Sequence, residues 1–407
     1  MGRGERMGPV ALDTLSMGNV PQILEIIFSS LDYESTNACL EANNTWNEVV
    51  MLTLESFRVK GKSLFRGEML KDENRLKELW FASKRGETDQ VRHLLSEMVD
   101  VGCFSSSPLE VDYYLTPLFI SSRRGHEDIV QVILNAGVDP NKGGVNVVNA
   151  PLHTAAAGGH KRVVRLLMDG GAKADKADQW GQRPLHYAAM NGHKEVIQVL
   201  LERGAKSDRA DKWGQTPLYV AALKGHKDVM QTLLDGGAKA DRADKWEQTP
   251  MYEAAMKGHK DAVQLLLDRG AKHSKADWFG RSPLFCAAME GHKYVVQVLL
   301  NGGAEFNKAD QCGWTPLYAA AKWNHKDVVK ALLDGRADPN KTDQDGRTPL
   351  YEAARLRCID AVKTLLDGGA DPNKADDVGK TPLDIALRDR CMDIVQILNP
   401  DGHYMDG

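Results

Sequence analysis

Histidine is the side chain best suited to exchange protons near neutral pH, and this sequence repeats it at a nearly constant interval. The seven are His126, His160, His193, His226, His259, His292 and His325. Six follow a glycine, and His325 follows an asparagine. A general acid–base site needs one histidine whose pKa is tuned by particular neighbours. A histidine that recurs at a nearly constant interval instead predicts a structural role, as a hydrogen-bond partner for the backbone of a turn.

Other residues that could bind a metal ion or a phosphate do not complete a motif. Residues 343–346 (DQDG) resemble the start of a calcium loop, but Ala354 stands where the closing acid is needed. Gly143-Gly144 and Gly158-Gly159 lack the lysine and the strand-then-helix setting of a phosphate loop. The six cysteines form no CxxC pair, so neither a disulfide framework nor a zinc site is predicted. We therefore expect no enzyme activity, no cofactor and no metal.

Composition restricts the kinds of partner. The chain has 407 residues, a net charge of −4 and 42% apolar residues, so a nucleic acid or an anionic lipid surface is not a favoured partner. No apolar stretch is long enough to span a membrane, and the opening residues MGRGERMG lack the apolar run of a signal peptide. Scattered cysteines suit a reducing compartment. We expect a cytoplasmic or nuclear protein without a membrane segment.

The elements that position the histidines come from a repeated unit. A proline set in Thr-Pro-Leu, or a close variant, recurs first after 34 residues and then seven times after 33. The nine are Pro117, Pro151, Pro184, Pro217, Pro250, Pro283, Pro316, Pro349 and Pro382. Periods of this length are typical of stacked supersecondary units, none of which can bury its apolar face alone. The sequence therefore predicts a solenoid.

One unit shows the elements that the pattern predicts. Thr216 is suited to cap a first helix and Pro217 to occupy its first position. Gly225-His226 ends that helix, and residues 229–234 give a second helix an apolar face at helical spacing. Glycine then stops the second helix, and residues 238–246 lead to the next Thr-Pro as a hairpin-like finger.

This pattern resembles the ankyrin repeat. The Thr-Pro-Leu opening, the Ala-Ala pair, the Gly-His turn, the Leu-Leu second helix and the Gly-Ala exit all match over residues 76–398. Residues 76–95 look like an opening repeat without its proline, which gives ten repeats, with an extended loop after Met98. The resemblance implies an all-α solenoid of helix-turn-helix units with β-hairpin-like fingers. It also implies protein binding on a concave face lined by finger tips and first helices.

Several residues depart from the usual repeat. The family's histidine after Thr-Pro-Leu is kept only at His153 and His186; aromatic residues replace it at Tyr219, Tyr252, Phe285, Tyr318 and Tyr351. We expect each hydroxyl to find a local partner. Non-glycine residues stand at glycine positions, namely Glu247, Asn324, Arg336, Arg357 and Arg390. A left-handed backbone there would cost about 1 kcal/mol each, less for Asn324, and would loosen the C-terminal repeats.

Apolar residues at the finger tips and first-helix ends form the candidate binding surface. The tips at period 33 are Trp180, Trp213, Trp246 and Phe279, with Trp278 and Trp314 nearby. The helix ends are Met190, Leu223, Met256, Met289 and Trp323. Exposed apolar patches with Trp and Met usually mark interaction sites. We predict a groove over the repeats of Pro184 to Pro316; the alternative is that these aromatics pack on the neighbouring repeat.

Charged residues alternate along the same fingers. They are Lys212, Lys245, Arg242 and Arg281, with Asp211, Asp244 and Asp277. We expect a surface that is largely self-paired, in which exposed pairs contribute little to stability and tune the choice of partner.

The N-terminal residues differ in composition. We expect residues 1–18 to be flexible, residues 19–65 to form a small helical segment and residues 399–407 to form a tail. Val20-Pro21, Ile27-Phe28, Leu31-Asp32 and Trp46 resemble an F-box, although Pro21 to Ile27 is one residue short and Thr36 and Ala42 depart from its pattern.

The F-box resemblance implies docking to a Skp1-type adaptor of a cullin ubiquitin ligase. Pro21, Ile27, Phe28 and Leu31 would then contact the adaptor, and Trp46 would hold the small core. The alternative is a helical cap on the first repeat. Two functions stay open: the substrate receptor of a Skp1–cullin–F-box ligase, and an ankyrin scaffold or inhibitor with no ligase link.

Overall fold

The computed structural model describes residues 69–97, 116–142 and 149–400. The chain divides into two compact units, Met1–Met69 and Leu70–Gly407, and the second contains nearly all the described residues. The predicted F-box positions Pro21, Ile27, Phe28, Leu31 and Trp46, and the loop after Met98, lie outside the described ranges. Within those ranges every regular element is a helix, and none is long and apolar enough to cross a membrane.

The described helices form ten pairs, as the period predicts. The first pair is α4 (Met69–Arg85) and α5 (Thr88–Glu97), which is the opening repeat without its proline. The next are α6 (Pro117–Arg124) and α7 (Glu127–Asn135), α8 (Pro151–Ala157) and α9 (Lys161–Asp169), α10 (Pro184–Met190) and α11 (Lys194–Glu202), α12 (Pro217–Lys224) and α13 (Lys227–Asp235), and α14 (Pro250–Met256) and α15 (Lys260–Asp268). The last are α16 (Pro283–Met289) and α17 (Lys293–Asn301), α18 (Pro316–Lys322) and α19 (Lys326–Asp334), α20 (Pro349–Arg355) and α21 (Ile359–Asp367), and α22 (Pro382–Arg388) and α23 (Met392–Leu398).

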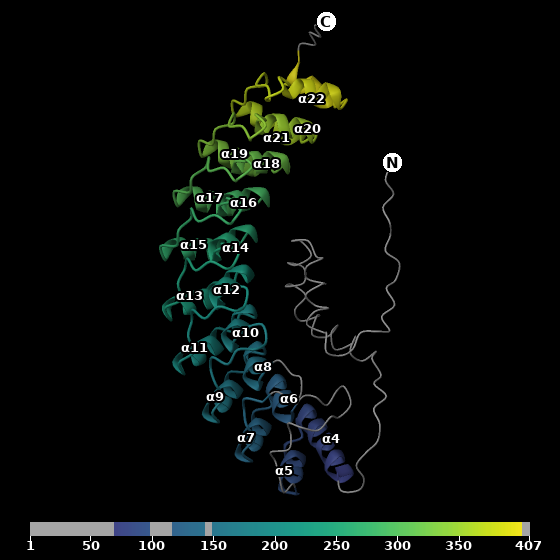
Figure 1. The fold of residues 1–407 in the computed structure, drawn as a ribbon, viewed down its shortest axis with the longest axis vertical. Coiled ribbons are helices and arrows are strands. Elements are labelled where there is room, and N and C mark those ends of the chain that lie inside the picture. Colours follow the sequence, from purple (N-terminus) through teal and green to yellow (C-terminus); the bar gives the residue numbers. More distant parts are fainter. Residues whose placement is uncertain (1–68, 98–115, 143–148, 401–407) are drawn as a thin grey trace. The chain divides into compact units, whose positions relative to one another are not determined.

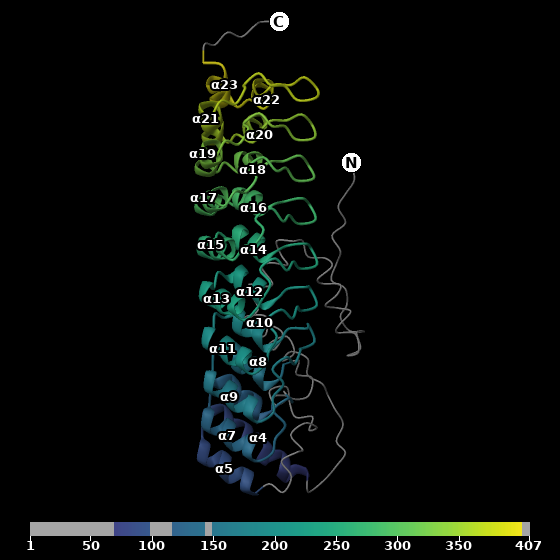
Figure 2. The ribbon, with the colours of Figure 1, turned by 90° about the vertical axis from the view of Figure 1, so that its left-hand side faces the viewer.

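The pairs stack in two layers. First helices pack on first helices, such as α12 on α14, and second helices pack on second helices, such as α13 on α15. Within this unit the row of first helices lies on the inner side of the bend (Figure 1). The connecting fingers project from the side of the first helices (Figure 2). This arrangement confirms the predicted solenoid and places finger tips and first helices on one side.

The predicted capping residues begin the first helices. The hydroxyl oxygen of Thr216, whose backbone is extended, accepts a hydrogen bond from the Tyr219 amide at 3.2 Å. Pro217 follows at the first helical position, where no amide hydrogen is needed. Each cap of this kind contributes about 1 kcal/mol. The same bond is made by Thr116, Thr249, Ser282, Thr315, Thr348 and Thr381.

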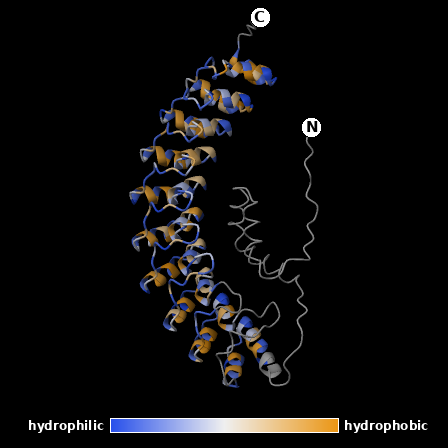
Figure 3. Cartoon of the chain, viewed as in Figure 1, coloured by the Kyte–Doolittle hydropathy of each residue, from blue (hydrophilic) through white to orange (hydrophobic). Residues whose placement is uncertain are grey.

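A continuous apolar core runs through the stack. Ala221 and Ala222 of α12 are fully buried, which lets the first helices of adjacent repeats approach closely. Val229 and Leu233 of α13 fill the space between the layers. Figure 3 shows apolar residues along the helices and hydrophilic residues along the connecting loops. Because this core is shared between neighbours, each repeat depends on the next for burial.

The repeated histidines join neighbouring repeats. The Nε2–H of His226 donates to the carbonyl oxygen of Met190 at 3.1 Å, across 36 residues. The bonds of His126, His160, His193, His259, His292 and His325 are equivalent. The predicted structural role is confirmed, although the partner is the preceding repeat. Gly225, which precedes His226, has a φ of 72°, and a Cβ there would lie 2.5 Å from the His259 ring. Glycine is therefore favoured at this position both by the backbone conformation and by the close approach of the next histidine.

The non-glycine residues at glycine positions do adopt the left-handed backbone. The φ values are 62° for Glu247, 57° for Asn324, 69° for Arg336, 61° for Arg357 and 55° for Arg390. Two of these side chains make compensating bonds: Asn324 Oδ1 accepts from the Ala361 amide at 3.0 Å, and Arg357 donates to the Asp389 carbonyl at 2.8 Å. The predicted strain is therefore present, and three of its five sites are arginines in the C-terminal repeats.

Candidate functional site

Each finger is built on one aspartate. In the finger of Trp213, Asp211 Oδ1 accepts hydrogen bonds from the amides of Trp213 and Gln215, both at 2.9 Å. The Asp211 amide donates to the Gln215 carbonyl at 2.9 Å, which closes a tight turn. Equivalent turns form at Asp178, Asp244, Asp277, Asp310, Asp343 and Asp376. The tip residue therefore has a fixed backbone in every finger.

Backbone hydrogen bonds align the tips in a row. The Lys212 amide donates to the Trp180 carbonyl at 2.9 Å, and the Lys245 amide donates to the Trp213 carbonyl at 2.9 Å. In the next fingers the backbone amide likewise donates to the tip carbonyl of the preceding finger: Trp278 to Trp246, Gln311 to Phe279, Gln344 to Cys312 and Asp377 to Asp345. The expected hairpin-like fingers are thus joined side by side, although no strand is assigned in the described ranges.

The aromatic residues that replace histidine anchor each finger to a helix. The Tyr252 hydroxyl donates to Asp277 Oδ2 at 2.9 Å, 25 residues ahead. Tyr219, Tyr318 and Tyr351 make the same bond to Asp244, Asp343 and Asp376. Burial raises the pKa of the Tyr252 phenol well above its usual value. Phe285 has no hydroxyl to offer Asp310, so among the five fingers that follow an aromatic residue this link is absent from that of Asp310.

The predicted partner-binding residues divide by exposure. Trp246 is 43% exposed, Trp278 and Phe279 are each 62% exposed, and Trp323, at the end of α18, is 57% exposed. Trp180, Trp213, Trp314, Met190, Leu223 and Met289 are half-buried. Because the backbone ladder joins the fingers of Trp246 and Phe279, three exposed aromatic rings lie on two adjacent fingers. We call Trp246, Trp278 and Phe279 the aromatic tip cluster.

Met256 was expected at an exposed helix end, and this expectation is wrong: its side chain is 7% exposed. It packs in a second apolar cluster with Tyr252, Phe285 and Cys286. Phe285 and Cys286 of this cluster belong to the following repeat. The inner side of α14 is therefore filled by the protein's own side chains.

Trp314 also packs on its own repeat. Its ring stacks on Tyr318, with centroids 5.3 Å apart and an interplanar angle of 18°. Lys322 Nζ lies 3.8 Å from the Trp314 ring centroid, a cation–π contact. These contacts lie within its own repeat, whereas the alternative considered for these aromatics is packing on the neighbouring repeat.

Charges on the fingers are paired only in part. Arg281 forms an ion pair with Asp277 Oδ2 at 2.6 Å. Its guanidinium also lies 5.0 Å from the Phe279 ring centroid, a cation–π contact with the exposed ring. Arg242 lies 3.8 Å from Asp208. Lys212 and Lys245 are exposed, and neither makes an ion pair with the described part of the chain. Their neighbours Asp211 and Asp244 are buried and bind the amides of their own fingers.

Two buried carboxylates, Asp244 of the Trp246 finger and Glu253 of α14, share one hydroxyl group. The Tyr219 hydroxyl lies 3.0 Å from Glu253 Oε1 and 3.1 Å from Asp244 Oδ2, so one proton serves two acids. Burial raises the pKa of Glu253 to about 7 and also raises the pKa of Asp244. The sequence around Glu253 did not indicate a buried acid, because its neighbours Tyr219 and Asp244 come from α12 and from the finger of Trp246.

The equivalent acid three repeats later is compensated. Glu352 accepts two hydrogen bonds from Arg355, at 2.8 and 2.7 Å, and lies 3.9 Å from Lys322 Nζ. Around Glu253 the positions of those two cations are taken by Met256 of its own repeat and Leu223 of the preceding repeat. Glu253 is therefore the less compensated of the two buried glutamates.

Sequence reasoning missed the exposed ring of Tyr294. Tyr294 on the outer helix α17 is 66% exposed, and Lys260 Nζ lies 5.9 Å from its ring centroid. It stands where other repeats have Asp228, Asp261 and Asp327, so aligning the repeats could have revealed it. It lies on a second helix, away from the tip cluster.

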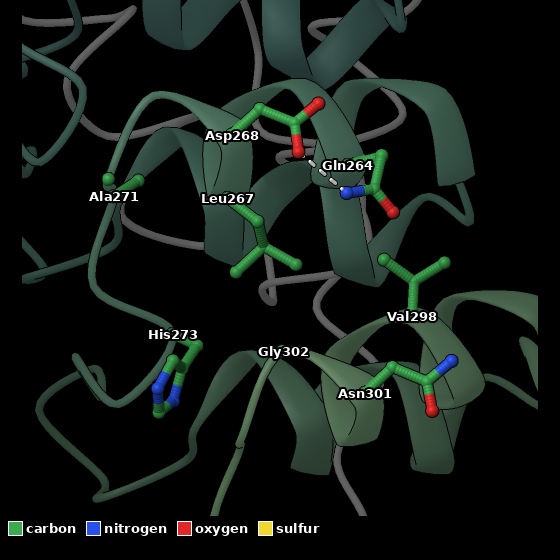
Figure 4. A pocket seen from close by; sticks show the side chains of 9 residues that line it. Gln264, Leu267, Asp268, Ala271, His273, Val298, Asn301 and Gly302 are labelled. Atoms are coloured by element: carbon green, nitrogen blue, oxygen red, sulfur yellow. Dashed lines mark hydrogen bonds between the residues drawn. The ribbon is translucent and has the colours of Figure 1, made fainter.

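A shallow pocket of about 360 Å³ lies between α15 and α17 (Figure 4). Leu267 and Val298 line it, and Gln264 donates to Asp268 at its rim at 2.8 Å. The buried Nδ1 of His273 has no hydrogen-bond partner. The pocket includes none of the predicted site residues, and no metal-binding group of three or more ligands occurs in the described ranges.

Comparison with known families agrees with the geometry. A family model described as ankyrin repeats (3 copies) matches the chain in overlapping segments, at residues 79–169, 144–211, 204–277, 233–310, 272–343, 295–376 and 335–406. Together these segments cover residues 79–406. A search of curated proteins finds no match.

Proposed function

Since the chain belongs to the ankyrin-repeat family, we propose that it works by binding a target protein across the fingers and first helices between Pro184 and Trp323. Ankyrin repeats are protein-interaction modules, and the finer proposal is where the target lies. The aromatic tip cluster is the observation that supports this location. Three large rings are exposed on two adjacent fingers, and such patches on a protein surface usually mark an interaction site.

The tip cluster is also held rigidly. The Asp244 and Asp277 turns fix the backbone of Trp246 and Phe279, and Arg281 supports the Phe279 ring. The ladder bond from the Trp278 amide to the Trp246 carbonyl, at 3.3 Å, joins the two fingers. A surface that is already ordered loses little entropy on binding. Aromatic anchors on such a surface are expected to provide most of the binding free energy.

The test compares two variants that each remove exposed aromatic rings. Trp246→Ala with Trp278→Ala removes two rings of the tip cluster, and Tyr294→Ala removes an exposed ring from the second helix α17. We expect quantitative affinity purification to show that the tip variant loses proteins that both the wild type and Tyr294→Ala retain. Circular dichroism should show unchanged helix content in both variants. Full retention of the same proteins by the tip variant would contradict the proposal.

A finer function concerns the N-terminal residues. We propose as a second candidate that residues 19–65 dock a Skp1-type adaptor, which would make the chain a substrate receptor of a Skp1–cullin–F-box ligase. The support is the residue pattern of Pro21, Ile27, Phe28, Leu31 and Trp46 alone. These residues precede the family match at 79–406. The competing hypothesis is an ankyrin scaffold or inhibitor without a ligase link.

A direct binding experiment separates these two. Purified Skp1 should be retained by the wild-type chain and lost from the variant Pro21→Ala with Leu31→Ala. The repeat surface should be unaffected by that change. If the wild-type chain does not retain Skp1, the ligase hypothesis is wrong and the scaffold hypothesis stands.

A further inference from the structure

From the finger of Trp213 onward, the chemistry of the finger edge changes in order along the stack; the finger before it carries Gln179 and Trp180, a polar and an aromatic residue. In each of the later fingers we compare the residue before the tip with the tip itself. The pairs are Lys212 and Trp213, Lys245 and Trp246, Trp278 and Phe279, Gln311 and Cys312, Gln344 and Asp345, and Asp377 and Val378. The edge therefore passes from basic and aromatic, through aromatic and polar, to acidic.

The positive charge at the first two of these fingers is available to a partner. Lys212 and Lys245 are exposed and make no ion pair with the described residues, as reported above. The nearby acids Asp211 and Asp244 are buried and hydrogen-bonded inward.

One exposed acid lies on these two finger tips and must be counted. Glu247 follows Trp246 on the same finger. Among the exposed charges of the two tips, the two lysines outnumber this one acid. A chain whose net charge is −4 thus presents a locally basic edge next to its exposed aromatic rings.

The spacing of the fingers suggests the conformation of the ligand. Packed helices lie about 8–10 Å apart, and the ladder keeps adjacent fingers in backbone contact. A polyproline II peptide, which is extended, rises about 3.1 Å per residue and has three residues per turn. Every third residue of such a peptide would therefore face the same side and lie opposite the next finger.

We propose that the finger edge from Lys212 to Phe279 binds an extended acidic segment of the partner protein. Two carboxylates, three residues apart, lie on Lys212 and Lys245, and an apolar side chain three residues further lies on Trp278 and Phe279. This inference rests on the proposed function and gives the partner a chemistry. Charge complementarity of this kind sets partner choice and association rate.

Synthetic peptides test the proposal directly. The probe is a fluorescein-labelled peptide of sequence ESSESSF, compared with the charge-reversed KSSKSSF, and binding to the full chain is followed by fluorescence anisotropy. We expect the acidic probe to bind at least about fivefold more tightly than the basic one. Binding should weaken as salt is raised, because exposed charges are screened.

Two double variants with the same change in net charge provide the control. Lys212→Glu with Lys245→Glu should weaken the acidic probe by at least about fivefold. Lys330→Glu with Lys363→Glu, at exposed positions of α19 and α21, should leave it unchanged. Equal loss in both variants would show a general charge effect and overturn the proposal.

The outcomes also separate this inference from the proposed function. If the acidic probe fails to bind, or the basic probe binds equally well, the acidic-segment proposal is wrong. The proposed function would still stand if the tip variant loses proteins that Tyr294→Ala retains. If that comparison fails too, the finger surface is not the binding site.

Discussion

Tyr219, Tyr252, Tyr318 and Tyr351 each use one hydroxyl to tie a helix to the finger that follows it. Phe285 stands at the same position without the hydroxyl, and the half-buried Asp310 opposite it accepts bonds from backbone amides. Phe285→Tyr should restore the link and raise the free energy of unfolding by about 0.5–1.5 kcal/mol.

Denaturant unfolding measures this difference. Tyr318→Phe, the reverse change at the bond to Asp343, serves as the matched control and should lower stability by a similar amount. A destabilised Phe285→Tyr protein would mean that the buried site around Cys286 has no room for the extra oxygen.

Glu253 gives a pH dependence at the same scale. Its pKa is about 7 in the fold, because burial penalises the charged form, and about 4.3 in an unfolded chain. The folded-state pKa is the higher one. The stability contributed by the protonated acid is therefore complete below about pH 4 and is lost as the pH rises through about 7.

Glu253→Gln keeps the neutral form at every pH. At about pH 8 its free energy of unfolding should exceed that of the wild type, by an amount on the order of 2 kcal/mol, and the two should converge near pH 4. Glu352→Gln is the control: it removes a carboxylate bound by Arg355, so it should destabilise the protein at pH 8. A pH-independent difference for Glu253→Gln would contradict the shifted pKa.

At the scale of the helical element, the turns that follow helices store strain in the last repeats. Arg336 and Arg390 hold left-handed backbones, with φ of 69° and 55°. Arg336→Gly and Arg390→Gly should each raise the free energy of unfolding by about 1 kcal/mol, since glycine adopts this conformation without a Cβ clash. Thermal and denaturant unfolding provide the measurement.

Arg357→Gly is the informative comparison among these turns. Its side chain donates to the Asp389 carbonyl at 2.8 Å, so relief of strain is offset by a lost hydrogen bond and the gain should be smaller. If all three glycine variants behaved alike, the side-chain bond would contribute nothing to stability.

Elements were predictable from the sequence because their signals are local. Thr216 and Pro217 begin a helix through contacts within four residues, and Gly225 ends it through its own backbone. The site was only partly predictable. Met256 is buried by Phe285 and Cys286 of the following repeat, which no pattern within its own repeat could show.

The buried glutamate illustrates the same limit. Glu253 shares the hydroxyl of Tyr219, which lies 34 residues earlier and on the preceding first helix. The absence of counterparts to Lys322 and Arg355 beside it becomes visible only when Leu223 and Met256 are aligned with those two cations. Residues that meet through stacking cannot be paired until the stack itself is known.

At the scale of the whole repeat unit, stability should be shared between nearest neighbours. Ala255 is fully buried in the core between first helices, and Ala255→Asp would place an unpaired charge there at a cost of several kcal/mol. We expect unfolding to separate into two transitions on either side of α14. Hydrogen exchange followed by mass spectrometry should show early exchange around α14.

Gln264→Ala, at an exposed position of α15 in the same repeat, is the control and should leave a single transition. A single transition for Ala255→Asp as well would mean that the repeats are coupled over a longer range than their immediate neighbours.

The backbone ladder between the fingers has one further consequence. Its amides and tip carbonyls are already hydrogen-bonded to one another from Trp180 to Asp377. Few backbone donors and acceptors are therefore left at this edge for a target to bind. Recognition must depend on the side chains that the fingers display. Two positions per finger could therefore be rewritten to retarget the protein, by mutation in nature or by design, while the scaffold that presents them stays intact.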